Sequence, residues 1–452
     1  GEVIAHRGMA FSHQRAEPLD IMGAQRLGGG QRAGILRDDM MGTPVDERVE
    51  LIAGGLQLGQ GTIDVLGYRP ARVERPLDEL GAFCASTEDE GGPTHPYAVL
   101  GADGIRAGVA WLRELVGESL LGDVETNTAL PTALGGLRPT ALYPPSMAAG
   151  AVSLDPAAPG ALHGGGSVVV VGIDQLKDFS PRLVAENLAV VGLPDGGLLT
   201  TRSASISFPG RGTEADSNAV NIARALDRPG RRGEFIAALR TVSRRGETVA
   251  VPNVLGLDPA TFRAVADGLD RPLFEIPLPP PGVAGLRLND LLTDLAKAAR
   301  VELIGGSRVT GARTGEGRVR SLLVGTAGHE TALEARAFLL APGGFESGAL
   351  ELDSHGVLHE RILGLPLAVP DGELLNDAWA GRQPIFRVGV AADAAMRVVE
   401  PSTGRPVHEN LHAAGGILAG AQRWDEKSGE GIALASAVRA ADSIIESLKE
   451  SA

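Results

Sequence analysis

The order of apolar and polar residues along the chain changes near residue 56. Residues 1–50 hold ten Val, Ile, Leu or Phe residues, and no period of 2 or 3.6 continues there for more than a turn or two. Four of the six methionines also lie in this part, namely Met9, Met22, Met40 and Met41. From about residue 56 onward, strand-like and helix-like patterns alternate. We therefore treat residues 1–55 as atypical and the remainder as an ordinary α/β chain.

Several segments have the spacing expected of buried strands and one-sided helices. The most apolar is 167–173 (SVVVVGI), a β-branched run typical of a strand covered on both faces. Segment 104–121 places Ile105, Val109 and Leu112 near one face and predicts a helix. Similar patterns predict helices at 178–191, 218–226, 232–243, 288–299 and 431–448, and strands at 247–251, 301–304, 319–326 and 331–340. This alternation predicts a mainly parallel sheet with helices on both sides.

Composition and charge narrow the classes of function. The 452 residues carry 42 Lys and Arg against 56 Asp and Glu, a net charge of −14, which argues against a nucleic-acid binder. A single cysteine, Cys84, excludes an internal disulfide, a four-cysteine zinc site and an iron–sulfur cluster held by this chain alone. We expect no metal site here, so electron transfer would use an organic cofactor or a partner's metal.

Targeting and membrane signals are not evident in the sequence. No apolar run approaches the ~18–20 residues that span a bilayer, and no signal segment opens the chain. The P-loop, zinc-protease and serine-hydrolase motifs do not occur either. We expect a cytoplasmic protein.

Three glycine-bearing stretches are the candidate ligand sites. In the first, Gly59, Gly61 and Thr62 form a small polar loop (GQGTID, 59–64) that a planar ring could approach. In the second, a predicted strand ends at Gly343 and Gly344. The third joins a strand to the last helix through Gly415, Gly416, Gly420, Gly429 and Gly431. Strand, glycine loop and helix start together point peptide amides at an anion or a flavin edge. Ordinary glycine turns are the alternative interpretation.

From about residue 56 to the end, the sequence resembles the B-subunit family of anaerobic glycerol-3-phosphate dehydrogenases. The resemblance covers roughly 390 residues in family order. It rests on GTIDVLG (61–67), THPY (94–97), VVVVGI (168–173), NAVNIAR (218–224), PLPPPG (277–282), GLRL (285–288), FLLAPGGF (338–345), ILGL (362–365) and NLHAAGGILAG (410–420).

The resemblance implies a fold, a reaction and partners. The fold would be the two-domain FAD-type flavoprotein fold, with a Rossmann-like parallel sheet and an inserted second domain. Residues 56–100 and 285–452 would form the flavin-binding domain, and residues 101–284 the inserted substrate or partner domain. Family members oxidise sn-glycerol 3-phosphate to dihydroxyacetone phosphate with FMN, and FAD is the other flavin that this fold admits. A second flavoprotein subunit and a membrane-associated iron–sulfur subunit would pass electrons to quinone and dock the chain at the cytoplasmic face of the membrane.

Residues 1–55 depart from the family pattern of a strand followed by Gly-x-Gly-x-x-Gly and a long helix. The candidate glycines are Gly28, Gly30 and Gly34, one residue too widely spaced, although Ala33 satisfies the looser form. Gly42 and Pro44 interrupt the helix that should follow. The Arg-rich, Lys-poor composition indicates a GC-rich gene, in which alternative frames stay open. We therefore offer two hypotheses: a shifted reading frame over residues 1 to about 55, with the true frame resuming near residues 57–61, or a divergent N-terminal segment.

Alcohol oxidation by a flavin needs a base for the hydroxyl proton and cations for the phosphate. His355 and His359 follow the second glycine stretch and are candidates for the base, with Arg361 beside them. Arg224 and Arg287 are candidates for binding the substrate phosphate. A surface histidine, an ordinary ion pair or a helix cap would explain the same residues. Two alternatives remain for the whole chain: a structural subunit that has lost its flavin, and a flavoprotein acting on another hydroxy acid.

Overall fold

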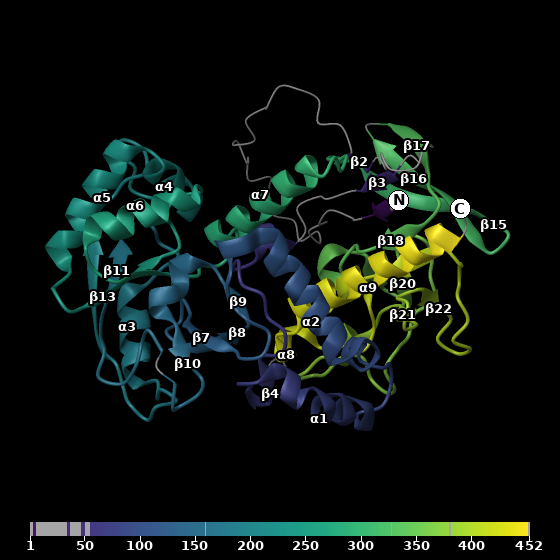
Figure 1. The fold of residues 1–452 in the computed structure, drawn as a ribbon, viewed down its shortest axis with the longest axis horizontal. Helices are drawn as coiled ribbons and strands as arrows, with labels where there is room; N and C mark the ends of the chain where they lie inside the picture. The colour runs from purple at the N-terminus through teal and green to yellow at the C-terminus, as the bar shows by residue number, and fades with distance from the viewer. Residues whose placement is uncertain are drawn as a thin grey trace.

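The fold is described from a computed structural model (Figure 1). It describes residues 55–158, 160–326, 328–378 and 381–450, together with the backbone of three short N-terminal strands. These strands are β1 (Val3–Ala5), β2 (Gly34–Leu36) and β3 (Glu47–Val49). Two large hydrophobic cores, each built around a parallel sheet, organise the described part of the chain.

The first core surrounds a three-stranded parallel sheet in the order β1, β18 (Phe338–Leu340), β23 (Leu411–Ala413). The long helices α2 (Pro96–Val116) and α9 (Gly429–Glu450) pack against each other beside it. Gly108 of α2 permits this close contact, because a Cβ there would lie 2.7 Å from the Ala435 amide nitrogen. Helices α1 (Pro76–Asp89) and α8 (Arg423–Glu426) complete the helical part of this unit.

An antiparallel meander joins the first core from one side. It consists of β15 (Arg308–Gly315), β16 (Arg318–Thr326) and β17 (His329–Glu334). Short two-stranded ribbons add β4 (Tyr68–Arg69) with β5 (Ala71–Arg72), β6 (Leu121–Gly122) with β9 (Leu142–Tyr143), β19 (Leu350–Leu352) with β20 (Leu358–Glu360), and β21 (Ala391–Ala392) with β22 (Val398–Val399).

The second core surrounds a four-stranded parallel sheet, on the left of Figure 1. Its order is β12 (Thr200–Ile206), β11 (Ser167–Ile173), β13 (Thr248–Pro252), β14 (Leu273–Ile276). Helices α3 (Pro181–Val190), α4 (Ala219–Leu226), α5 (Pro229–Val242) and α6 (Pro259–Leu269) belong to the same unit. Val168 to Val171 are fully buried, as the continuous β-branched run predicts for an inner strand.

The chain passes between the two cores twice. It enters the second core through β7 (Thr128–Pro131), β8 (Leu137–Thr140) and β10 (Val152–Ser153), and returns through α7 (Val283–Ala298). The start of α7 lies directly against the first glycine stretch. A Cβ on Gly61, whose φ is +73°, would lie 2.7 Å from the Ala284 Cβ, so only glycine fits this contact.

The predicted α/β class with an inserted parallel-sheet unit is confirmed, and so are most elements. Asn218 caps α4 and Asp258 caps α6, with Pro259 at the first position of α6. The strand expected at 301–304 is wrong, because these residues are irregular between α7 and β15. The strand expected at 331–340 is two strands, since β17 pairs in the meander and β18 in the parallel sheet, and the chain must turn between them.

The division between the two units also differs from the expected boundary at residue 101. Ile105, Val109, Leu112 and Val116 of α2 are buried in the first core. The second core begins with Ala129 and ends with Val283. Helix α2 therefore packs with the part of the chain that returns after residue 284, and the inserted unit begins later than expected.

Candidate functional site

The second and third glycine stretches meet at one edge of the first parallel sheet. Strands β18 and β23 are neighbours and run in the same direction, so the loops that follow them leave the sheet side by side. The Ala414 amide donates to the Leu340 carbonyl over 3.0 Å. A Cβ added to Gly344 would lie 2.9 Å from the Gly416 carbonyl oxygen. The two loops are therefore in direct backbone contact, and glycine is required for this approach.

Arg423 lies over both loops. Its guanidinium donates to the Gly416 carbonyl and, over 2.7 Å, to a carboxylate oxygen of Glu346. A Cβ on Gly416 would lie 2.7 Å from Arg423 Nη1. Part of the space beside the glycines is thus filled by a cation from α8. Sequence reasoning missed this residue because no motif links it to the strands.

The N-terminus of α9 adjoins the same loops. The Gly415 amide donates to Ser436 Oγ over 2.9 Å, and a Cβ on Gly429 would lie 3.8 Å from the Arg423 Cβ. The first turn of a helix exposes amide groups and carries a partial positive charge. The carboxyl edge of the sheet and this helix start therefore lie side by side.

The first glycine stretch joins this arrangement through Asp64. The Gly431 amide donates to the Asp64 carbonyl over 2.9 Å. The Asp64 carboxylate is ion-paired with Arg138 of β8, and Arg138 also donates to Thr62 Oγ1 over 2.6 Å. Asp64 is buried, yet its Oδ1, like Gln60 Oε1, has no hydrogen-bond partner among the described residues. Buried acceptors without donors mark a place where a bound group can donate.

Glu430 stands beside Asp64 in the first turn of α9. Its side chain keeps accessible surface. The surrounding protein nevertheless removes enough water to raise the pKa of its carboxyl to about 7, and repulsion from Asp64 adds to this increase. The Arg138 charge and the backbone amides of Glu430 and Asp64 lower the pKa of the Glu430 carboxyl and so oppose part of this increase. Glu430 is thus an accessible carboxyl that titrates near neutrality.

A buried network behind α9 fixes its start. His95 Nδ1 accepts from the Tyr97 amide, and His95 Nε2 lies 3.2 Å from Glu426 Oε2. Ser428 Oγ donates to the same carboxylate over 2.7 Å, and the Tyr97 hydroxyl donates to the Ser428 carbonyl over 3.2 Å. Burial would raise the pKa of Glu426, but the hydrogen bonds from His95, Ser428 and the Gln422 amide outweigh it and lower the pKa.

The predicted base candidates do not reach these loops. His355 is exposed at the turn of the β19–β20 ribbon, and His359 Nε2 lies 3.0 Å from Asp353 Oδ2 in the same ribbon. Arg361 is ion-paired with Glu351 at the surface. All three side chains are engaged locally or point to solvent, so the structure does not bring them together with the glycine stretches.

The predicted phosphate-binding arginines belong to the second unit and its boundary. Arg224 is exposed on α4. Arg287 of α7 is largely buried, with an ion pair to Glu275 at 2.7 Å and a hydrogen bond to the Gly256 carbonyl at 2.8 Å. A guanidinium already neutralised by a buried carboxylate has little capacity left for a phosphate dianion.

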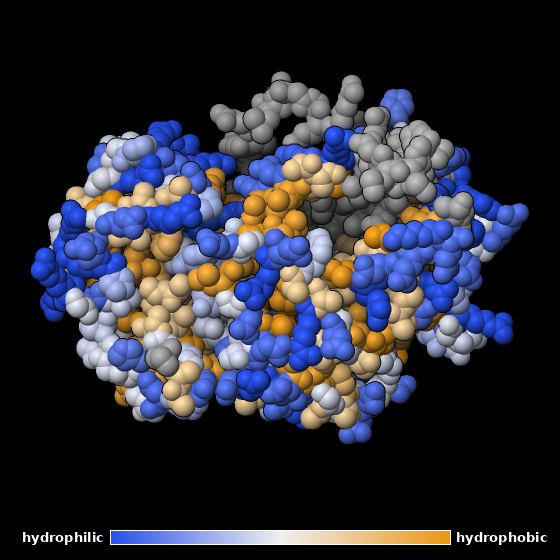
Figure 2. Space-filling model, in the orientation of Figure 1, coloured by the Kyte–Doolittle hydropathy of each residue, from blue (hydrophilic) through white to orange (hydrophobic). Residues whose placement is uncertain are grey.

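Arg287 and Gly61 nevertheless share a cavity of about 400 Å³ between the two units. Its wall is largely apolar, with Phe262 and Leu291 among the lining residues, and Figure 2 shows an apolar area over α7 on the same part of the molecule. The other charged residues of the lining are Arg263, Glu118, Asp290 and Asp294. Acidic groups outnumber basic ones here, which disfavours a phosphate dianion.

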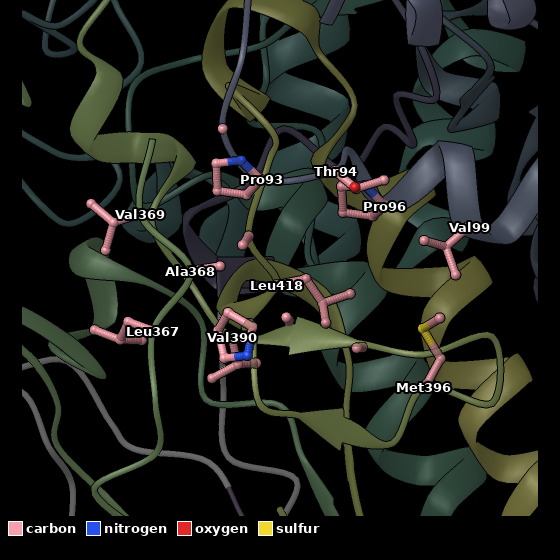
Figure 3. A pocket seen from close by; sticks show the side chains of 15 residues that line it. Pro93, Thr94, Pro96, Val99, Leu367, Ala368, Val369, Val390, Met396 and Leu418 are labelled. Carbon is pink, nitrogen blue, oxygen red and sulfur yellow. The ribbon is translucent and has the colours of Figure 1, made fainter. Parts of the chain in front are cut away.

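A second cavity, of about 410 Å³, lies between the start of α2 and the β21–β22 ribbon (Figure 3). Pro93, Pro96, Val390, Met396 and Leu418 are among its lining residues. None of the side chains that line it is charged. It borders Leu418 and Ala419, close to the third glycine stretch, but offers no group for acid–base chemistry.

Some predictions fall outside what the structure describes. Gly28 and Gly30 lie outside the described residues, and Gly34 is described only as backbone of β2. The reading-frame hypothesis therefore stays a hypothesis. In the described part of the chain, no helix combines the length and apolar character needed to cross a membrane.

Comparisons with known proteins agree on one family. The model of a family described as "FAD binding domain" matches residues 28–432. The chain is 30% identical over 409 residues to the probable B subunit of the anaerobic glycerol-3-phosphate dehydrogenase of Halobacterium salinarum, covering 87% of this chain and 91% of the relative. It is 29% identical to the B subunit of the anaerobic glycerol-3-phosphate dehydrogenase of Pectobacterium atrosepticum, with coverage of 88% and 93%.

Among solved structures, 3-ketosteroid Δ1-dehydrogenase from Sterolibacterium denitrificans is similar at 12% identity and a TM-score of 0.40, covering 88% of this chain and 95% of that one. The family match and the curated relatives span most of the chain and agree with the resemblance noted in the sequence. The chain therefore belongs to the FAD-binding domain family of oxidoreductases and, within it, to the B-subunit family of anaerobic glycerol-3-phosphate dehydrogenases.

Proposed function

We propose that this protein oxidises sn-glycerol 3-phosphate to dihydroxyacetone phosphate with a bound flavin, as one subunit of a larger enzyme. The names of its relatives support both the substrate and the subunit role. Electrons would leave through a second flavoprotein subunit and an iron–sulfur subunit to quinone, and these partners would hold the chain at the membrane.

The observation that carries the proposal is the meeting of all three glycine stretches at the start of α9. Gly344 and Gly416 touch at the sheet edge, and Gly431 is hydrogen-bonded to Asp64. Backbone amides and a helix N-terminus suit the electron-rich carbonyl edge of a flavin or its phosphate. The unpartnered acceptor Gln60 Oε1 suits a ring N–H or ribityl hydroxyl donor. These residues therefore fit a flavin.

A bound flavin would supply the acceptor for the carbon-bound hydrogen and its electron pair. The residues of this chain would do the rest. The loops at Gly343–Gly344 and Gly415–Gly416, stiffened by Arg423, would orient the ring, and α9 would offer its amides. The family match favours FAD over the FMN expected from the sequence. The inserted unit around the second core, from Ala129 to Val283, would serve as the substrate or partner domain.

A structural subunit without flavin is the second candidate. Arg423 favours it to some degree, because it fills space beside Gly344 and Gly416. In that case the sheet edge would serve only to hold the loops together.

Purified protein separates the two candidates. Flavin binding predicts a yellow preparation, and release of the cofactor by denaturation followed by mass measurement identifies FAD or FMN. Under anaerobic conditions glycerol 3-phosphate should then bleach the visible absorption, whereas lactate and malate should not. A colourless protein that takes up neither FAD nor FMN contradicts the proposal, and bleaching by lactate or malate instead would reassign the substrate.

A further inference from the structure

Glu430 and Asp64 are neighbours that interact electrostatically where the three glycine stretches meet. The Gly431 amide, next in sequence to Glu430, donates to the Asp64 carbonyl over 2.9 Å, which holds the two residues beside each other. Their environments differ. Asp64 is buried and ion-paired with Arg138, whereas Glu430 is accessible. Two adjacent carboxyls in different environments are a recurrent arrangement for acid–base chemistry.

The second observation is the unpartnered oxygen of Asp64. Arg138 engages Oδ2, but Oδ1 is buried without a hydrogen-bond partner among the described residues. A glutamate in the first turn of a helix is by itself commonplace, since it interacts favourably with the helix dipole. A buried acceptor left open beside it is not explained by helix stability. It is explained if Asp64 Oδ1 receives a proton-bearing group during function.

We propose that Glu430 accepts the hydroxyl proton of the substrate in the flavin-dependent oxidation described above, with Asp64 as its positioning residue. The inference rests on that proposed function. The substrate O–H bond breaks and its proton passes to the Glu430 carboxylate. The C–H bond of the same carbon would break with its electron pair, a bound oxidised flavin would be the acceptor of that hydride, and the carbon–oxygen bond would become a carbonyl. Asp64 Oδ1 is available to accept a hydrogen bond from the protonated Glu430.

The charged and titratable groups that face Glu430 support this role. Asp64 comes from the first glycine stretch, Arg138 from β8 and Tyr97 from α2. The surrounding protein, which removes water from the carboxyl, and the Asp64 charge raise the pKa of Glu430 to about 7, so the carboxylate form that accepts a proton becomes available as the pH rises through neutrality. His355, the base expected from the sequence, is exposed at the β19–β20 turn.

The test is the rate of anaerobic flavin reduction by glycerol 3-phosphate, followed in a stopped-flow instrument across neutral pH with flavin-loaded full-length protein. For the wild type we expect a rate constant that rises through about pH 7. Glu430→Gln should bind flavin with an unchanged visible spectrum, reduce it about 10²–10⁴-fold more slowly and lose the pH-dependent rise. Glu430→Asp, which keeps a carboxyl, should recover part of the rate.

Two control variants should behave as wild type. Glu446→Gln removes an exposed carboxyl from the far end of the same helix, and His355→Gln removes the base expected from the sequence. An unchanged rate and pH profile in Glu430→Gln overturns the inference, and so does loss of flavin by both Glu430 variants, which would assign Glu430 to cofactor binding. If flavin in the wild type is not reduced by glycerol 3-phosphate at any pH, the proposed function itself fails, and this inference fails with it.

Discussion

His95 Nε2 lies 3.2 Å from Glu426 Oε2, with side-chain exposures of 0% and 2%. The Tyr97 amide donates to His95 Nδ1, so Nδ1 must be unprotonated and Nε2 carries the ring hydrogen. A neutral imidazole therefore donates to a carboxylate that also accepts from Ser428 and the Gln422 amide. This contact ties the start of α2 to the segment that leads into α9.

Replacing His95 by Ala should destabilise the protein by about 1–3 kcal/mol, because it leaves a buried carboxylate without one of its hydrogen-bond donors. The N-terminal cap of α2 is lost at the same time. Denaturant unfolding measures the change. The exposed histidine of the β19–β20 ribbon supplies the control, since His355→Ala should change stability by less than about 0.5 kcal/mol. A cost near that of the control would show that the buried pair contributes little.

Glu426 should also make the free energy of unfolding depend on pH in the acidic range. Its pKa is lowered in the folded state, so its contribution is complete above the unfolded value of about 4.3 and is lost as the pH falls through the lower folded value. Glu426→Gln should therefore flatten the loss of stability below about pH 4, relative to wild type. Unfolding free energies measured from acid to neutral pH test this, and parallel curves for the two proteins would contradict it.

Gly420→Ala should be far more damaging than an ordinary glycine substitution. Gly420 has a φ of +98°, and a Cβ there would overlap the Thr94 carbonyl oxygen. Left-handed strain of about 1–2 kcal/mol adds to about 1–3 kcal/mol of overpacking. Gly404 is the matched control, because its φ is +68° and nothing lies within 4 Å of the position that a Cβ would take there. Equal thermal shifts in the two variants would argue against the contact with Thr94.

We expect the side chain of Arg287 to contribute to the free energy of unfolding rather than to substrate binding. Arg287→Met removes one partner of a buried ion pair and should cost about 3–5 kcal/mol. Adding Glu275→Gln to Arg287→Met should recover part of the lost stability, because the double variant no longer buries an unpaired Glu275 carboxylate. A double-mutant cycle in denaturant measures the coupling. If Arg287→Met keeps wild-type stability but loses affinity for glycerol 3-phosphate, the phosphate-binding role expected from the sequence is the better account.

Arg423→Gln should weaken flavin binding about tenfold, or about 1.4 kcal/mol. The guanidinium fixes the Gly416 carbonyl and Glu346 at the sheet edge, and without it the two glycine loops lose their common anchor. Titration of apoprotein with FAD, followed by flavin fluorescence, gives the affinity. Arg361→Gln removes a surface ion pair outside the glycine loops and should leave the affinity unchanged. Tighter flavin binding by Arg423→Gln would instead indicate that Arg423 occupies the flavin's place.

The parts of the fold set by local pattern were predictable from the sequence. The run 167–173 could only be a buried strand, because four consecutive valines gain most when both faces are covered. Asn218 marks the start of the helix predicted at 218–226, because its side chain caps that helix through a short-range hydrogen bond. The three glycine stretches and the family were also evident, since motif and order are properties of the chain itself.

The arrangement of the site depended on contacts that no local pattern contains. The expected strand 331–340 divides between two sheets because its halves pair with different strands, and residues 301–304 are irregular between α7 and β15. Arg138 reaches Asp64 across 74 positions, and Glu426 reaches His95 across 331. The sequence by itself therefore determined the elements, the fold class and the glycine loops. Only the tertiary structure decided which charged groups stand beside those loops, because packing distant segments together creates the ion pairs and the desolvation that give those groups their chemistry.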